Sequence, residues 1–250
     1  MNAKRSFDFL VAFAGLVILA PALLLIACVI FAEDRRSPFF FGTRVARNGG
    51  EFRMLKFRSM VPGAWKTGVS STASTDQRIT STGAFLRRFK LDEFPQLWNV
   101  VVGDMSLVGP RPQVSTDARM YTSEERRLLT ARPGITDLAS IVFADEGEIL
   151  ADSADPDLLY NQIIRPWKSR LGLLYIDQHT LSVDVRILAL TLFSAISRPR
   201  ALAGVAHILE SWHADPILLR AASRQHPLLP WPPPGADEVV QKYPTQAAHA

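Results

Sequence analysis

An uncharged apolar run from Phe9 to Ala32 limits most strongly what this chain can fold into. The run contains 24 residues, of which 22 are hydrophobic. A straight helix of this length would measure ~36 Å at ~1.5 Å per residue, which is enough to cross a lipid bilayer. Pro21 lies at its centre and removes a backbone donor, so we expect a kink there. The two halves are then 12 and 11 residues long, and each is too short to cross alone.

Basic residues on both sides of the run favour a helix that leaves the membrane by the face it entered. Positively charged flanks stay on the cytoplasmic side of a membrane. A straight span satisfies this rule at one end, whereas a kinked helix that re-enters satisfies it at both. We therefore predict a Pro-kinked re-entrant membrane helix in preference to a straight span. The flanking residues are Lys4 and Arg5 before the run and Arg35, Arg36, Arg44 and Arg47 after it.

Two processed forms compete with this interpretation of the run. A cleaved signal peptide would have a shorter apolar core. The tetrapeptide Leu25-Ile26-Ala27-Cys28 resembles a lipoprotein cleavage site, and acylation of Cys28 would anchor an exported protein. The run continues past Cys28 to Ala32, however, and a free cysteine often acts as a small apolar residue. We favour this apolar role for Cys28.

The rest of the chain has the composition of one soluble domain. Without the apolar run, the hydrophobic share falls from 48% to about 43%, a normal value for a globular protein. The single cysteine excludes a disulfide framework and a zinc site built from several cysteines. We predict an α+β, helix-rich protein. Its parts are a membrane anchor over 1–36, one compact domain over 37–200 seated on the membrane, an amphipathic helix within 201–225 and a Pro-rich, extended or disordered tail over 226–250.

Local signals place the elements of the domain. Asn48-Gly49-Gly50 is a hairpin turn signal, so we expect two short strands around it within 44–60. Thr122 and Glu125 form a capping box that begins a helix ending near Ala131. The apolar pattern predicts further helices over 83–102, interrupted or bent near Pro95, and over 158–173, 183–196 and 201–220.

The charge is distributed unevenly along the chain. Residues 33–132 carry 17 Lys and Arg against 10 Asp and Glu, whereas residues 133–250 carry 9 against 13. A basic first half can face anionic lipid, phosphate or nucleic acid, although solvated helix faces give the same count. Nucleic acid is disfavoured because the basic stretch has no recognised binding motif or stacking pattern. The sequence has no nucleotide-binding glycine motif, and its five histidines lie outside the basic stretch, which leaves a Ser/His/Asp triad without support.

The densest polar cluster surrounds the pair Asp92-Glu93. Arginines match phosphate oxygens two at a time, so their number along this stretch indicates a polyanionic substrate. Of two adjacent carboxylates, one can attack phosphorus while the other holds magnesium, which prefers oxygen ligands and shares them with substrate phosphates. A solvated helix turn with Arg87 or Arg88 as the salt-bridge partner also explains the pair.

Arg111 is singled out by the two prolines that enclose it. The rings of Pro110 and Pro112 restrict the backbone and hold the arginine side chain ready for a ligand. The alternative is that this segment is only a rigid surface turn.

Several motifs follow one another along residues 4–196. They are Lys4-Arg5…Asp8, the Pro-interrupted apolar segment, Lys56-Phe57-Arg58-Ser59-Met60, Asp76-Gln77-Arg78-Ile79-Thr80, Leu91-Asp92-Glu93-Phe94-Pro95-Gln96-Leu97-Trp98-Asn99-Val100, Gly103-Asp104…Gly109-Pro110-Arg111-Pro112 and Arg132-Pro133-Gly134-Ile135-Thr136. Together they closely resemble the bacterial sugar transferases, the monotopic polyprenyl-phosphate hexose-1-phosphate transferases. The resemblance implies an enzyme that moves a sugar-1-phosphate from a UDP-sugar to a polyprenyl phosphate, usually undecaprenyl phosphate, and releases UMP.

The resemblance also implies a place in the cell and roles for single residues. The enzyme would sit in the bacterial inner membrane with its domain facing the cytoplasm, and would start exopolysaccharide, capsule, lipopolysaccharide O-antigen or protein-glycan assembly. It would act as a minimal catalytic form, with a homo-oligomer as one option. Asp92 would be the nucleophile that carries the phosphosugar, Glu93 would help to bind Mg²⁺, and Arg111 would bind the donor's phosphate or nucleotide. Weaker candidates for phosphate contacts are Lys56, Arg58, Arg78, Arg88 and Arg132.

Some positions depart from the family pattern. Lys90 stands where a small hydroxyl residue is common and adds charge near the carboxylate pair. Asp137 and the acidic stretch Asp145–Glu148 either bind the sugar's polar groups or are solvated loop charges, of which we favour the latter. A different class of function also remains: a membrane-anchored basic module that binds anionic polymer or lipid without catalysis and does not require Asp92.

Overall fold

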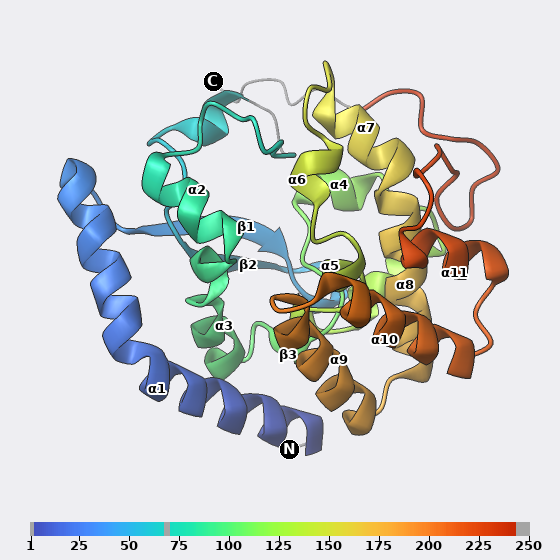
Figure 1. The fold of residues 1–250 in the computed structure, drawn as a ribbon, viewed down its shortest axis with the longest axis horizontal. Coiled ribbons are helices and arrows are strands. Elements are labelled where there is room, and N and C mark those ends of the chain that lie inside the picture. Colours follow the sequence, from blue (N-terminus) through green and yellow to red (C-terminus); the bar gives the residue numbers. More distant parts are fainter. Residues whose placement is uncertain (1–2, 68–70, 244–250) are drawn as a thin grey trace.

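The computed structural model describes residues 3–67 and 71–243. Its first element, α1 (Ala3–Asp34), is one helix of 32 residues that continues through Pro21. The mean hydropathy of its most apolar stretch is 2.9, so length and composition would let it cross a membrane. Figure 1 shows that α1 changes direction part-way along and borders the domain on two sides. Whether it re-enters the membrane remains a prediction. Its exposed side chains are mostly apolar, among them Leu10, Phe13, Val17, Ile18, Leu24 and Leu25.

The first turns of α1 are fixed to the domain by polar contacts. Asp8, only 1% exposed, accepts hydrogen bonds from the Ser106 hydroxyl (2.7 Å) and from the backbone N–H of Leu107 (3.2 Å). The Lys4 ammonium donates to the buried carboxylate of Asp184 at 2.6 Å. Both carboxylates lie within the domain and cannot be left without partners, so these contacts fix where α1 starts.

A hairpin of two strands crosses the centre of the molecule (Figure 1). β1 (Phe39–Val45) pairs antiparallel with β2 (Glu51–Phe57). The turn η1 (Arg47–Gly49) has two residues at positive φ, Asn48 at 64° and Gly49 at 87°. The predicted hairpin is therefore confirmed, because its Asn-Gly turn adopts the left-handed backbone that these residues tolerate best. The first strand begins earlier than predicted and includes the aromatic run that starts at Phe39.

The helical stretch predicted over 83–102, with an interruption near Pro95, is confirmed in outline. The structure has α2 (Ser81–Arg88), a 3₁₀ turn η3 (Leu91–Glu93) and α3 (Gln96–Val102). The interruption begins before Pro95, because Lys90 has a left-handed φ of 54°. Pro95 instead precedes the first residue of α3, where its missing N–H leaves no helical hydrogen bond unmade. This break places the carboxylate pair on a turn between two helices.

A second pair of strands joins two distant motifs. β3 (Ser106–Val108) lies parallel to β4 (Gly134–Thr136), and α4 (Ser115–Arg119) and η4 (Glu125–Thr130) lie between them in sequence. The predicted capping box is confirmed, because Thr122 and Glu125 exchange hydrogen bonds of 3.1 Å between side chain and backbone. The segment that follows is a 3₁₀ helix, which corrects the predicted α-helix. A short 3₁₀ turn, η2 (Ala64–Thr67), precedes α2.

Helices form the remaining half of the molecule and enclose its main core. The prediction over 183–196 is close to α9, but two other predicted helices are each divided at a proline. Pro166 starts α8 and Pro216 starts α11, since a proline is accepted in a first helical turn and not in a helix interior. The elements are α5 (Leu138–Val142), α6 (Glu146–Ile149), α7 (Pro156–Ile163), α8 (Arg165–Gln178), α9 (Leu181–Ser194), α10 (Arg198–Ser211) and α11 (Pro216–Ser223).

The described part of the Pro-rich tail, 226–243, has no helix or strand and turns at residues 233–236, where the N–H of Ala236 donates to the carbonyl of Pro233 at 3.1 Å. Trp231 packs against Trp167 of α8 with ring centroids 5.5 Å apart. This part of the tail packs on the domain, and the choice between an extended and a disordered tail stays a prediction. Residues 244–250 lie outside the described residues.

Candidate active site

The carboxylate pair lies on η3, opposite the end of strand β2. Asn99 of α3 joins the two, because its side-chain oxygen accepts from the N–H of Leu55 and its amide nitrogen donates to the carbonyl of Arg53, both at 2.9 Å. Asn99 is 3% exposed, so its buried side chain bonds to the backbone of β2 much as a neighbouring strand would. This contact places Lys56, the next residue of β2, beside Glu93.

Glu93 is held by two cations. The Lys56 ammonium donates to it at 2.8 Å, and the Arg111 guanidinium binds both of its oxygens, one of them at 3.0 Å and the other at closer range. Burial alone would raise the pKa of Glu93, but Arg111 and Lys56 together hold that pKa well below its usual range. Glu93 is therefore ionised at any physiological pH, and both of its carboxylate oxygens accept hydrogen bonds from cations.

Contact between the Gly-Pro-Arg-Pro and Arg-Pro-Gly segments orients Arg111. The N–H of Gly134 donates to the carbonyl of Pro110 at 3.0 Å, and the N–H of Gly109 donates to the carbonyl of Thr136 at the same distance. A Cβ atom at Gly134 would lie 2.1 Å from the nitrogen of Gly109, so no larger residue fits. The close backbone approach fixes the Pro-Arg-Pro turn. Arg111 on this turn binds Glu93, so the segment does more than form a rigid surface turn.

Asp92 differs from its neighbour although the two are adjacent. It is 5% exposed, and within residues 3–67 and 71–243 no hydrogen bond reaches its carboxylate. Burial raises the pKa of Asp92, an effect that the charge of Lys56 opposes and that of Glu93 reinforces. The site thus contains one carboxylate that is fully paired and one that is buried, close to cations and without a bonded partner.

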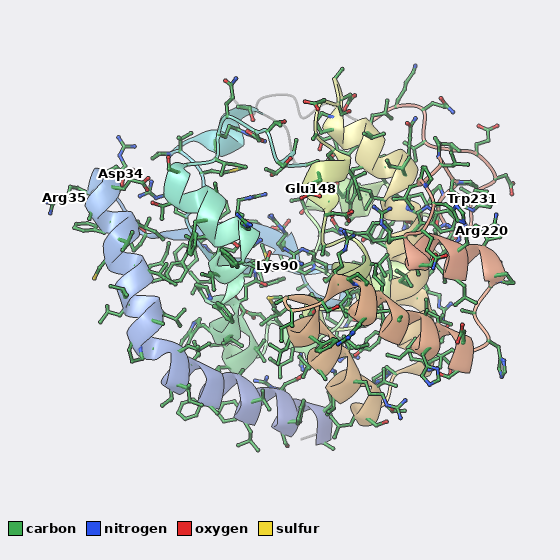
Figure 2. The ribbon with its side chains drawn as sticks, viewed as in Figure 1. Asp34, Arg35, Lys90, Glu148, Arg220 and Trp231 are labelled. Carbon is green, nitrogen blue, oxygen red and sulfur yellow. The ribbon has the colours of Figure 1, made fainter. Side chains whose placement is uncertain are left out.

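The charges of two further cations act on Glu93: Arg44, which the sequence analysis did not assign to the site, and Lys90, whose charge it expected there. Burial and the charge of Arg111 lower the pKa of Arg44 to about 10, and Glu93 is among its opposite charges. Loss of hydration lowers the pKa of Lys90, which also faces Glu93 and Arg111. Figure 2 shows Lys90 near the centre of the molecule, on the segment that follows α2.

The hairpin register contains a signal that could have identified Arg44. Arg44 pairs with Phe52, and Lys56 pairs with Phe40. Side chains two residues apart share one face of a strand, and paired residues share a face across strands. Arg44 and Lys56 therefore lie on the same face, but that deduction requires the register, which the turn signal alone does not give.

Four of the predicted phosphate-binding residues lie apart from the carboxylate pair. Arg58 binds both oxygens of Asp34 at 2.6 Å and holds the end of α1, which Figure 2 shows at the outer edge of the molecule. Arg78 pairs with Asp76, and Arg88 is exposed beside the ring of Phe89. Arg132 is surrounded by other charges, namely Arg5, Arg47, Asp8 and Asp104.

The carboxylate pair is not an ordinary solvated helix turn. In the described part of the chain, the ion pairs of Glu93 are with Lys56 and Arg111, and neither Arg87 nor Arg88 takes that place. The charge of Arg87 acts on Asp92 only at longer range.

The acidic positions downstream are engaged inside the protein. Asp137 is 4% exposed and accepts from the backbone N–H of Ser140 at 2.6 Å, so it caps α5. Asp145 forms ion pairs with Arg198 and Arg224 and joins α10 and α11 to the domain. The solvated interpretation of these two acids is wrong, because both are held by contacts within the protein.

The donor atoms near η3 limit how a metal ion could bind. No cluster of three or more His, Cys, Asp and Glu side chains occurs among the described residues. Asp92 and Glu93 offer carboxylate oxygens, which suit magnesium in the mode where one or two carboxylates share the ion with substrate phosphates and water. The residues present therefore fit Mg²⁺ bound together with a substrate, and do not form a complete protein cage.

Known proteins match this chain over the anchor and the domain. A family model described as bacterial sugar transferase matches residues 1–198. The chain belongs to the bacterial sugar transferase family. The carboxylate pair of η3 lies inside the matched region.

Individual relatives carry names that agree with this family. The exopolysaccharide production protein ExoY of Sinorhizobium fredii is 38% identical over 156 residues, 56% of this chain and 68% of that protein. A UDP-galactose-lipid carrier transferase of Erwinia amylovora is 38% identical over 54% of this chain and 31% of its own length. The UDP-N-acetylgalactosamine-undecaprenyl-phosphate N-acetylgalactosaminephosphotransferase of Aeromonas hydrophila is 31% identical over 66% of this chain and 40% of its own. The chain therefore spans less than half the length of these last two relatives.

Proposed function

We propose that this protein transfers a sugar-1-phosphate from a UDP-sugar to undecaprenyl phosphate and releases UMP, with Asp92 as the covalent carrier. The observation that carries the proposal is the division of labour on η3: Glu93 is neutralised by Lys56 and Arg111, while Asp92 is buried and unpaired. A carboxylate without a bonded partner keeps its lone pairs available for attack, and buried groups with shifted pKa values cluster at reactive sites.

In the first step, a carboxylate oxygen of Asp92 attacks the phosphorus that carries the sugar. The bond between that phosphorus and the oxygen bridging to the uridine-bearing phosphate breaks, and UMP leaves with the electron pair. An acyl-phosphate bond then joins the sugar-phosphate to Asp92. The positive charges of Lys56, Arg87 and Arg111 act on Asp92, which lowers the repulsion between an anionic nucleophile and an anionic diphosphate.

In the second step, an oxygen of the polyprenyl phosphate attacks the same phosphorus. The acyl-phosphate bond breaks, Asp92 regains its carboxylate, and the polyprenyl-diphosphate-sugar is released. Two diphosphate-type species use one cationic site in turn, and a covalent carrier allows the first to leave before the second reacts.

Magnesium would be held by Glu93 together with the substrate's phosphates, and would supply charge neutralisation at the diphosphate. Because both oxygens of Glu93 already bind cations, the ion would share or replace one of those contacts.

The membrane arrangement follows from α1. Its exposed apolar side chains would lie in the lipid of the bacterial inner membrane, and a re-entrant course would keep the domain on the cytoplasmic side, where UDP-sugars occur. The polar clamps at both ends of α1 would hold the cationic site at the level of the lipid phosphates.

Mass spectrometry of the intact protein tests the covalent step. Purified protein given a panel of UDP-sugars with Mg²⁺ and no acceptor should gain the mass of one sugar-phosphate and release one equivalent of UMP. Asp92→Asn should do neither. Turnover of UDP-sugar with undecaprenyl phosphate in the absence of any adduct would contradict the covalent carrier. Absence of UMP release from every donor, together with retained binding of anionic lipid, would favour the non-catalytic basic module instead.

A further inference from the structure

Residues 226–243, which we call the C-terminal strap, cross the helical side of the domain. Pro232-Pro233-Pro234 prevents a helix there. Trp231 donates its backbone N–H to the carbonyl of Gln162 at 3.0 Å, and its ring packs on Trp167. Figure 2 shows Trp231 on the side of the molecule opposite Asp34, the last residue of α1. The first part of the strap therefore lies far from that end of α1 and is held by contacts with the domain.

Hydrogen bonds continue along the strap toward its end. Backbone carbonyls of the strap accept them from side chains of three separate parts of the domain, namely α8, α7 and the capping box. The pairs are Arg170 Nη1 to Pro232 O at 2.9 Å, Gln162 Nε2 to Val240 O at 2.9 Å and Thr122 Oγ1 to Pro234 O at 2.5 Å. Contacts to backbone rather than to side chains fix the path of the strap itself.

The strap reaches a wall of the cavity beside Arg111. The hydroxyl of Tyr243 donates to Asp117 of α4 at 2.7 Å. Asp117 is 9% exposed and lines a small pocket together with Arg111, Gln113 and Tyr160. A buried carboxylate at a pocket wall requires partners, and Tyr243 is one of them.

Asp117 in turn is a counter-charge for Arg44. Asp117 and Glu93 are the acids that favour the charged form of Arg44, whereas burial and Arg111 oppose it. The backbone N–H of Val45, next to Arg44, donates to the carbonyl of Gln113 at 2.9 Å, so a hydrogen bond joins β1 to the segment that follows the Pro-Arg-Pro turn. Gln113, Arg111 and Asp117 line the same small pocket, so Asp117 stands in the wall that these segments share.

The ionisation of Asp117 depends on every group that faces it. Burial raises the pKa of Asp117, the hydrogen bond from Tyr243 lowers it, and the neighbouring acid Asp157 of α7 raises it. Arg165 of α8 and Arg44 of β1 also lower that pKa. Loss of the Tyr243 hydroxyl would therefore move Asp117 toward its neutral form.

We propose that the C-terminal strap positions the wall of the donor pocket beside Arg111, with Tyr243 holding Asp117 of α4 in that wall. This inference rests on the proposed function, since it assigns Arg111 to the UDP-sugar's diphosphate. The family match ends at residue 198, so the strap lies outside the region common to the family. Tyr243 acts through Asp117 and is a positioning residue.

Tyr243→Phe tests the proposal with the full chain in detergent or bilayers. Lys242→Ala, at the exposed neighbouring position, is the matched control. We expect Tyr243→Phe to raise the KM for the UDP-sugar about three- to tenfold, the effect of one lost hydrogen bond to a charged group, with kcat within about twofold. Because the pKa of Asp117 rises in the variant, the increase in KM should grow as the pH falls. Lys242→Ala should match the wild type at every pH.

Binding of UDP, measured by calorimetry in an Asp92→Asn background, separates this inference from the proposed function. We expect Tyr243→Phe to weaken UDP binding about as much as it raises KM. Normal turnover and unchanged UDP binding in Tyr243→Phe would overturn the role of the strap and leave the transferase intact. UDP binding that depends on Tyr243 without any UMP release would overturn the transferase and leave the strap's role. Absence of UDP binding in every form would overturn both.

Discussion

Two buried aspartates, Asp8 at the start of α1 and Asp92 on η3, are almost equally enclosed and differ in their partners. Asp8 is 1% exposed and accepts hydrogen bonds from Ser106 and Leu107. Asp92 is 5% exposed, and no described residue donates a hydrogen bond to it. A buried carboxylate with partners stabilises a joint between two elements, whereas one without bonded partners is typical of the functional site proposed for η3. Partners, rather than burial, therefore separate the joint at the start of α1 from the proposed reactive site.

The largest expected effect is at Asp92 itself. Asp92→Asn should lower the rate of UMP release about a thousandfold or more, because no nucleophile remains. The same variant should unfold at a higher temperature than the wild type at neutral pH, since the cost of burying this carboxylate exceeds the stabilisation from the nearby cations and raises its pKa. The raised pKa of Asp92 means that this penalty is present above that pKa and disappears as the carboxyl becomes protonated.

The gain in unfolding temperature from Asp92→Asn should therefore shrink as the pH is lowered toward about 4, the ordinary value for aspartate. Thermal unfolding at a series of pH values, with the activity assayed in parallel, provides the measurement. A variant that loses activity and stability together would show that Asp92 is a structural residue like Asp8.

Glu93→Gln comes next in size. The substitution leaves Lys56 and Arg111 without their shared counter-charge, so activity should fall about a hundredfold. The free energy of unfolding should fall by about 1–3 kcal/mol, which is less than the loss expected when a fully buried ion pair is broken. The pKa of Glu93 is depressed, so its stabilising ion pairs are present above about 4.3 and are lost only as the pH falls through the depressed value. Opposite signs of the stability change in Glu93→Gln and Asp92→Asn would confirm the division of labour; equal signs would refute it.

Asp8→Asn should have a smaller effect on catalysis and a clear one on the joint. The neutral side chain weakens the bonds from Ser106 and Leu107, which should lower the free energy of unfolding by about 1–3 kcal/mol. Ser106→Ala removes only one of these bonds and should have the lesser effect of the two. Limited proteolysis after α1 measures the loosening. A thousandfold loss of activity in Asp8→Asn would place this aspartate in the reactive site.

Arg58→Ala should have the smallest effect. Arg58 binds Asp34 at the outer end of α1, and exposed ion pairs contribute little to stability. We expect UMP release within about threefold of the wild type when measured in detergent. Arg111→Ala, assayed beside it, should lose far more. A loss at Arg58 equal to that at Arg111 would return Arg58 to the phosphate-binding residues that the family resemblance implied.

Some features of this fold follow from local sequence signals. The apolar run predicts α1, Asn48-Gly49 predicts the hairpin, and Thr122 with Glu125 predicts the capping box. Each signal depends on residues a few positions apart, so neighbours in the chain are sufficient to produce it. The break at Lys90 has no such signal, because a lysine at positive φ is unfavourable locally and is held there by contacts with the rest of the domain.

The sequence by itself determined three features of this protein: one apolar helix, a pair of adjacent carboxylates and an excess of cations along the stretch around them. Only the tertiary structure decided which cation meets which carboxylate. Lys56 is 37 residues from Glu93 and binds it, whereas Arg58, two positions further along, binds Asp34 at the end of α1. Charges pair according to distance in space, and that distance is set by the hairpin register, the break at Lys90 and the close contact of Gly109 with Gly134.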